Sequence, residues 1–285
     1  MTVRKGVVGG VAALAAVAAL GVWAGRTWVS DLPLPRTPSC TVRAGGQVTL
    51  DVTQMANAAT ITAIGVRDGM PERAVVIALA TAYQESRLEN LRHGDRDSLG
   101  LFQQRPSKGW GTPEQINDPR YSAATFYAAL KKVKGWEKMR VTDAAQRVQR
   151  SAYPEAYERW ADQSVVLAEA LLGKATGAVA CELGNTPKVR GGAAARAVAE
   201  ALRLDWGDLP AVAQPDALGL SVGAPDARAG WQYAHWLVAH AEDHGVRRVR
   251  FGTLQWTAGK GVWNTAKDSE AAGDGSVLAE VYADA

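Results

Sequence analysis

Glu85 holds the sequence position that best suits a general acid. It lies near the C-terminal end of a predicted helix that begins at Pro71, since proline is favoured at a first helical position. Counting back three, four and seven residues places Glu85 over Ala82, Thr81 and Ala78. Such small side chains would leave the carboxyl partly without water, which raises its pKa and lets it donate a proton at neutral pH. On this pattern alone, a glutamate near a helix end is more often a solvated surface residue.

Polar side chains follow Glu85 in a predicted loop over residues 91–111, which is rich in glycine, aspartate and proline. Asp97, with Asp95 behind it, is the candidate for a second carboxylate. An aspartate in such a loop serves equally often to stabilise a turn or a helix cap. The other candidates offer hydroxyl groups, amide groups or flat aromatic faces to a sugar polymer: Ser86, Ser98, Gln103, Gln104, Trp110 and Tyr121.

Helices are expected to position these residues, because residues 40–181 show helical spacing of apolar side chains and no convincing strand. The spacing predicts one helix over 51–64, and Thr112 begins a capping-box pattern before another. Prolines at first helical positions predict further helices from Pro119 and Pro154. We therefore expect an all-α domain over residues 40–181.

A smaller α/β domain is expected over residues 192–285, after a linker at 182–191. The pattern predicts two helices, over 193–202 and 225–244, and three strands, over 217–222, 246–251 and 277–282. The expected fold class is thus multi-domain, with an all-α domain and a small α/β domain behind an N-terminal transmembrane helix.

That transmembrane helix is predicted from residues 6–25, which carry no charge and are long enough to cross a bilayer. Arg4 and Lys5 precede them, so the positive-inside rule places the rest of the chain outside the cytoplasm. We expect residues 1–26 to form a cytoplasmic start and a membrane anchor, followed by a proline-containing stalk at 27–39. A cleaved signal peptide is the alternative, and it leads to the same compartment.

Cys40 and Cys181 are the two cysteines of the sequence. Outside the cytoplasm they are expected to form a disulfide, which for so long a loop contributes about 4–5 kcal/mol in the chain-entropy description. Two buried free thiols are the alternative. The net charge of +3 and the scattered basic residues do not indicate nucleic-acid binding.

His240 and His244 lie on one face of a predicted helix, with Glu242 between them. A zinc peptidase with this histidine spacing needs glutamate directly after the first histidine, whereas Glu242 lies about 200° round the helix. Histidines before a helix end are ordinary residues near the C-terminal dipole. We therefore expect no metal and no cofactor.

The segment ALATAYQES (78–86), followed by DSLGLFQQRP (97–106), resembles the signature of the lysozyme-like superfamily that contains soluble lytic transglycosylases and goose-type lysozymes. The family pattern is a Glu-Ser pair at the end of a buried helix, then a loop, then a Gly-Leu-(Met/Phe)-Gln run. The resemblance covers roughly residues 40–181 and is carried by Glu85, Ser86, Gly100, Leu101, Phe102 and Gln103.

This resemblance implies cleavage of the β-1,4 bond between N-acetylmuramic acid and N-acetylglucosamine in peptidoglycan, with Glu85 protonating the departing oxygen. A lytic transglycosylase needs one acid, and the substrate's acetamido group or C6 hydroxyl does the rest. An inverting hydrolase needs a second carboxylate, for which Asp97 or Asp95 is the candidate. The family motif has small residues near Asp97, so this departure favours a hydrolase. A non-catalytic wall-binding or scaffold protein is the alternative to both enzymes.

The run GWQYAHWLVAHAEDHGVRRVRFGTLQW (230–256) resembles a C-terminal domain of cell-wall hydrolases that is similar to D,D-carboxypeptidases. Those zinc enzymes take ligands from a histidine and an aspartate before this helix and from a histidine in the last strand. Residues 218–229 and 277–282 contain no histidine. The resemblance therefore implies a degenerate, metal-free domain.

Overall fold

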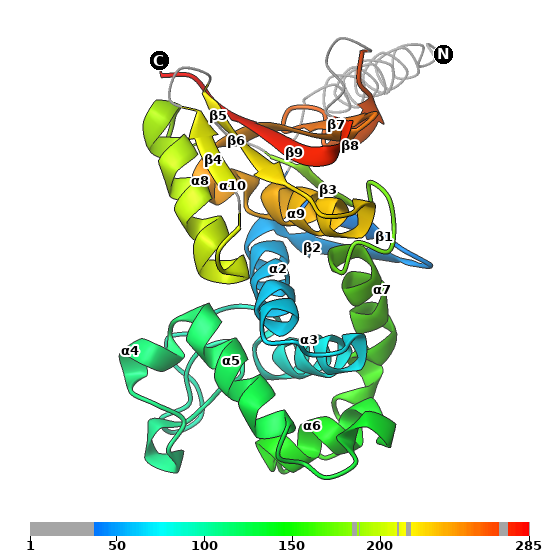
Figure 1. The fold of residues 1–285 in the computed structure, drawn as a ribbon. Helices are drawn as coiled ribbons and strands as arrows, with labels where there is room; N and C mark the ends of the chain where they lie inside the picture. Colours follow the sequence, from blue (N-terminus) through cyan, green and yellow to red (C-terminus); the bar gives the residue numbers. More distant parts are fainter. Residues whose placement is uncertain are drawn as a thin grey trace, which may run out of the picture. The chain divides into compact units, whose positions relative to one another are not determined.

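Two antiparallel sheets and a group of helices make up the described part of the chain (Figure 1). The computed structural model describes residues 37–183, 187, 189–209, 211–214, 218–267 and 273–284. Pro38–Ala285 form one compact unit. The expected fold class, with its all-α domain, was therefore wrong, and the fold is mixed α/β.

The smaller sheet lies inside the segment that was expected to be all-α. Its order is β2-β1-β3, from strands β1 (Ser39–Arg43), β2 (Gln47–Asp51) and β3 (Val179–Glu182). Cys40 lies directly opposite Cys181 in the antiparallel pair of β1 and β3, and a disulfide joins them. The predicted disulfide is confirmed, and it connects the two ends of the helical segment.

These strands escaped prediction because each has only four or five residues. In β1 and β2 buried and more exposed residues do alternate, as in a sheet with one covered face. A five-residue alternation is a weak signal beside long helical runs. The partner strand β3 lies far along the chain, so no local pattern marks the pairing.

Helix α3 (Glu72–Ser86) is central to the helical group. It contacts α2 (Val52–Arg67), α5 (Pro119–Leu130), α6 (Val141–Gln149) and α7 (Ala161–Leu171). Most of its residues are buried, which suits a helix with neighbours on several sides.

The predicted helix starts are mostly confirmed. Thr112 forms a capping box at the short helix α4 (Pro113–Ile116), and the Asp118 side chain caps α5. The helix predicted from Pro154 was placed too early. A 3-10 turn at Glu158–Trp160 comes first, and α7 begins at Ala161.

The larger sheet has the order β4-β5-β9-β6-β7-β8. Its strands are β4 (Ala211–Gln214), β5 (Gly219–Gly223), β6 (Val246–Gly252), β7 (Leu254–Thr257), β8 (Val262–Thr265) and β9 (Gly273–Val281). Strands β5, β6 and β9 match the three predicted strands, while the short strands β4, β7 and β8 were missed.

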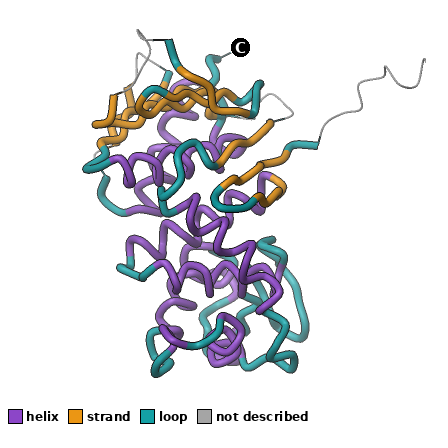
Figure 2. Tube along the Cα trace, turned by 90° about the vertical axis from the view of Figure 1, so that its right-hand side faces the viewer, coloured by secondary structure: helices purple, strands orange, loops and turns teal. Residues whose placement is uncertain are grey.

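Helices α8 (Gly191–Trp206) and α9 (Ala227–Ala239) pack against this larger sheet, and the one-turn helix α10 (Ala241–His244) follows α9. Figure 2 shows the strands as a layer with helices beneath it. Helix α2 contacts both α8 and α9, and α9 also contacts β3 and α7. The segments expected as two domains are thus packed together within one unit.

The predicted membrane anchor and most of the stalk, residues 1–36, lie outside the described residues. Among the helices that the structure does describe, none has the length and apolar character needed to cross a bilayer.

Candidate active site

Glu85 lies in the last turn of α3, where its side chain is partly buried. The Tyr157 hydroxyl donates a hydrogen bond to Glu85 Oε1 at 2.7 Å. The Gln149 side chain acts as a further donor that lowers the pKa of this carboxyl group, and Gln149 Nε2 donates to Phe102 O at 2.8 Å. The Tyr157 hydroxyl, from the segment after α6, therefore holds the carboxyl group in place, and Gln149 at the end of α6 acts on its pKa.

Burial raises the pKa of Glu85 above its ordinary value, although the hydrogen bonds from Tyr157 and Gln149 act in the opposite direction. Loss of water disfavours the charged form, and here that effect exceeds the hydrogen bonds. Burial and the neighbouring Glu85 charge raise the pKa of Tyr157, so its hydroxyl keeps its proton and remains a donor. The carboxyl group can thus carry a proton closer to neutral pH than an exposed glutamate can.

The chain turns sharply directly after this helix. Arg87 and Leu88 both adopt left-handed backbone conformations, with φ of 58° and 62°. For residues with a Cβ this costs about 1–2 kcal/mol each. Gln54 Nε2 and Asn57 Nδ2 of α2 donate to the carbonyl groups of Arg87 and Leu88, at 2.9 and 2.7 Å. Strained turns that neighbouring side chains support are frequent at ligand sites.

The Gly-Leu-Phe-Gln run forms a tight turn against the end of α3. Leu99 and Gln104 exchange two backbone hydrogen bonds across this turn, at 2.9 and 3.0 Å. Ser86 Oγ donates to Leu101 O at 2.8 Å and so ties the turn to the helix that carries Glu85. Gly100 has a φ of +74°, and a Cβ there would lie 2.6 Å from Ile116 O, so only glycine fits.

Three of the predicted substrate-binding residues are buried: Ser86, Ser98 and Gln104. Gln104 Nε2 donates to Ser122 O of α5 at 3.1 Å. The hydrogen-bonding groups of Ser86 and Gln104 are therefore occupied inside the protein, where they brace the turn.

The other three, Gln103, Trp110 and Tyr121, are partly exposed. Gln103 has a left-handed φ of 46°, and its Nε2 donates to Gly100 O at 3.2 Å. The Tyr121 ring packs over Gly111, where a Cβ would lie 2.7 Å from the tyrosine hydroxyl. These side chains remain candidates for contact with a ligand.

Asp97 is engaged in its own loop. Its Oδ1 accepts a hydrogen bond from Arg105 Nε at 2.7 Å, and its Oδ2 accepts one from the Ser107 backbone N–H at 2.8 Å. Hydrogen bonds from Ser107 and Arg105 hold the pKa of Asp97 well below its ordinary value. A carboxylate with so low a pKa is a weak proton acceptor. Asp95 is exposed, and its Oδ2 lies 3.8 Å from Arg96 Nε.

Sequence reasoning missed the two residues that contact Glu85. Tyr157 reads as one more apolar residue of the helix predicted from Pro154, and Gln149 reads as a surface residue near a helix end. Both lie more than sixty residues from Glu85 in the sequence, so no spacing rule connects them to it.

The histidines of the C-terminal half have internal partners. His240 is buried and stacks on Trp236 with ring centroids 4.0 Å apart, and its Nε2 lies 3.2 Å from Thr60 Oγ1. Within the part of the chain that the structure describes, no group of three or more histidine, cysteine, aspartate or glutamate residues could hold a metal ion.

A cavity of about 580 Å³ lies elsewhere, over strands β5, β6 and β9, with Arg190, Arg247 and Glu280 among its lining residues. None of its lining residues belongs to the surroundings of Glu85. The chemistry nevertheless favours Glu85, whose carboxyl group has a raised pKa and a specific donor in Tyr157.

No protein-family model matches the sequence, and a search among curated proteins finds no similar chain.

Proposed function

We propose that this protein cleaves the glycan strands of peptidoglycan, at the β-1,4 bond between N-acetylmuramic acid and N-acetylglucosamine, with Glu85 as the general acid. One observation carries the proposal. A partly buried carboxyl group with a raised pKa lies at a helix end, tied through Ser86 to a Gly-Leu-Phe-Gln turn. A glycosidase needs a carboxylic acid that stays protonated until it meets the glycosidic oxygen.

In the proposed reaction Glu85 gives its proton to the departing oxygen and becomes a carboxylate. The Tyr157 hydroxyl, 2.7 Å from Glu85 Oε1, then stabilises the new negative charge. Since that hydrogen bond is stronger to the charged form, it supports the proton transfer itself.

The state of Asp97 favours a mechanism with one acid. Both of its oxygens accept hydrogen bonds within the loop, and its lowered pKa makes it a weak base. The substrate's acetamido group or C6 hydroxyl would then attack the anomeric carbon as the glycosidic bond breaks, and the C6 hydroxyl would give its proton to the Glu85 carboxylate, as in a lytic transglycosylase. An inverting muramidase that uses Asp97 is the second route, and the ends of the released sugars distinguish the two.

The proposed location is outside the cytoplasm, on the membrane that the predicted anchor would cross. The disulfide between Cys40 and Cys181 supports an oxidising compartment. The proposed partner is peptidoglycan itself.

The test is digestion of purified peptidoglycan by the full chain in detergent, with mass spectrometry of the soluble products. We expect muropeptides from the wild type and a rate at least about a hundredfold lower from Glu85→Gln, the usual range for loss of a general acid. Glu89→Gln is the matched control, because Glu89 is exposed and lies four residues further on. Anhydro ends would identify a transglycosylase and reducing ends a muramidase.

If the wild type binds the wall and releases nothing, the protein is a non-catalytic peptidoglycan-binding or scaffold protein. For the C-terminal half we propose a role in binding the wall peptide or a partner.

A further inference from the structure

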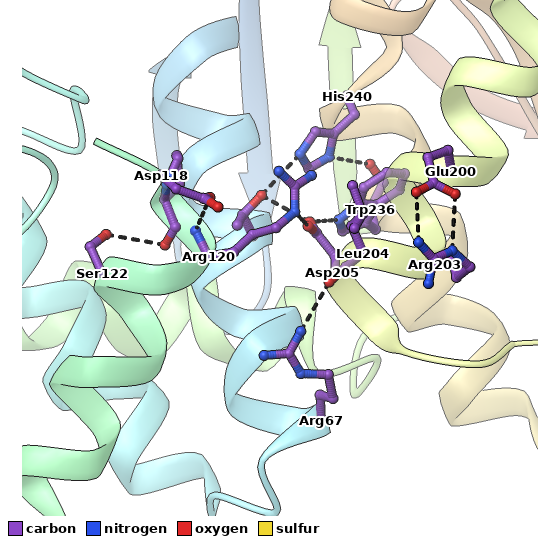
Figure 3. Close-up of polar contacts among 12 residues, drawn as sticks. Arg67, Asp118, Arg120, Ser122, Glu200, Arg203, Leu204, Asp205, Trp236 and His240 are labelled. Atoms are coloured by element: carbon purple, nitrogen blue, oxygen red, sulfur yellow. Dashed lines mark hydrogen bonds and ion pairs between the residues drawn. The ribbon is translucent and has the colours of Figure 1, made fainter. Parts of the chain in front are cut away.

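A buried carboxylate joins four helices at the contact between the two halves of the unit (Figure 3). Asp205, near the end of α8, is fully buried. Its Oδ2 accepts hydrogen bonds from Thr60 Oγ1 of α2 at 2.9 Å and from Trp236 Nε1 of α9 at 2.8 Å. Its Oδ1 accepts one from Arg120 Nε of α5 at 2.5 Å.

Arg120 supplies the positive charge in this network, and its side chain is 30% exposed. A carboxylate without water is stable only where donors and an opposite charge surround it. The Arg120 side chain is therefore held by Asp205 of α8, which Trp236 of α9 holds in turn. Arg120 is the second residue of α5, and its backbone N–H donates to the capping carboxylate of Asp118 at 2.9 Å.

Helix α5 also holds the turn beside Glu85. The carbonyl group of Ser122 accepts from Gln104 Nε2 at 3.1 Å, and Thr125 Oγ1 lies 3.2 Å from the same nitrogen. Phe126 stacks on Phe102 with ring centroids 4.6 Å apart. One helix thus carries both the partner of Asp205 and the groups that fix the turn.

The Gly100–Gln104 turn also contacts a side chain that acts on Glu85. Phe102 O accepts from Gln149 Nε2 at 2.8 Å, and the Gln149 side chain lowers the pKa of Glu85. A movement of α5 would displace Phe102 and with it the amide that acts on the catalytic carboxyl group.

We propose that Asp205 and Arg120 are positioning residues for glycan cleavage. Through their ion pair the C-terminal half holds α5, and α5 holds the Gly100–Gln104 turn against Glu85. This inference rests on the proposed function of Glu85. It gives the C-terminal half a part in catalysis that needs neither a metal nor direct contact with the reacting bond.

The structure offers a matched control. Arg67 Nη1 donates to Leu204 O at 2.9 Å, so Arg67 also connects the helical group to the end of α8. The other hydrogen bond of Arg67, from its Nε, is to Oδ1 of the adjacent Asp68, so neither of its described hydrogen bonds reaches α5. Arg67→Ala removes a link between the halves but not the link to the turn.

The experiment compares Arg120→Ala, Arg120→Lys and Arg67→Ala in the full chain. We expect Arg120→Ala to lower kcat on solubilised glycan strands roughly tenfold to a hundredfold with KM nearly unchanged, because small misplacements of a catalytic group have effects of this size. Arg120→Lys, which keeps the charge, should recover part of kcat. Arg67→Ala should keep the wild-type kcat. Wild-type kcat in Arg120→Ala, or an equal loss in Arg67→Ala, would overturn the inference.

A second measurement separates this inference from the proposed function. The Glu85 carboxyl group is titrated by carbon-13 NMR in each variant, with no substrate present. We expect its pKa to change in Arg120→Ala and not in Arg67→Ala, because only the first change reaches Gln149. If the wild type proves inactive on peptidoglycan, the proposed function fails. The titration alone then decides whether the Asp205–Arg120 ion pair acts on the surroundings of Glu85. An unchanged Glu85 titration in Arg120→Ala would then overturn the inference.

Discussion

Removal of the Tyr157 hydroxyl tests the environment of Glu85 most directly. In Tyr157→Phe the ring that fills the buried space remains, and only the donor at 2.7 Å from Glu85 Oε1 is lost. A hydrogen bond to a charged group contributes about 1.5–3 kcal/mol, and roughly 1.4 kcal/mol corresponds to one pKa unit. Because Gln149 remains as a second donor, we expect the lower end of this range.

The sign follows from which form of Glu85 the hydroxyl stabilises. Tyr157 donates to the carboxylate and so lowers the pKa that burial raises. The substitution should therefore raise the Glu85 pKa further, by about one unit. The acid would stay protonated to higher pH, and the alkaline limb of kcat/KM should move up by the same amount.

Carbon-13 NMR of labelled glutamate carboxyl groups measures this pKa without any substrate, and the pH–rate profile measures its effect on activity. Tyr153→Phe is the control, because Tyr153 is 74% exposed and its ring hydroxyl has no part in the site. A Glu85 pKa that stays constant or falls in Tyr157→Phe would refute the reasoning, since the hydroxyl would then not be donating to the carboxylate.

Two further predictions concern stability and the second carboxylate. His235 is fully buried, its Nε2 accepts from the Ala178 backbone N–H at 2.9 Å, and burial lowers its pKa to about 4. The unfolded state binds a proton at His235 more readily than the folded state does. The contribution of neutral His235 to the free energy of unfolding should therefore be present in full above about pH 6.5. It should fall by up to about 3 kcal/mol as the pH is lowered to 4. Denaturant unfolding at several pH values should show a smaller fall in the free energy of unfolding for His235→Gln than for the wild type. His93→Gln, which changes an exposed histidine, should show the wild-type fall. The same dependence of the unfolding free energy on pH in the wild type and both variants would contradict this. For Asp97→Asn we expect less than about a tenfold loss of activity, because Asp97 braces its loop and a lost general base would remove a hundredfold or more; a loss as large as that of Glu85→Gln would make Asp97 the base.

Sequence alone determined the features that depend on nearby residues. The cap at Thr112 joins a side chain to a backbone N–H three residues further on, so a short pattern is enough to predict it. The position of Glu85 at the end of a buried helix follows from helical spacing in the same way. The pairing of Cys40 with Cys181 was also predictable, because the sequence has no other cysteines.

Only the tertiary structure decided which distant groups meet. Strands β1 and β3 pair across almost the whole helical segment, and such short strands become stable only once the chain between them has folded. The donors Tyr157 and Gln149 reach Glu85 from other elements, and their hydrogen bonds and the burial around them set its pKa. Local sequence specifies helices and caps because their interactions span a few residues, whereas the chemistry of a carboxyl group depends on whatever the folded chain brings around it.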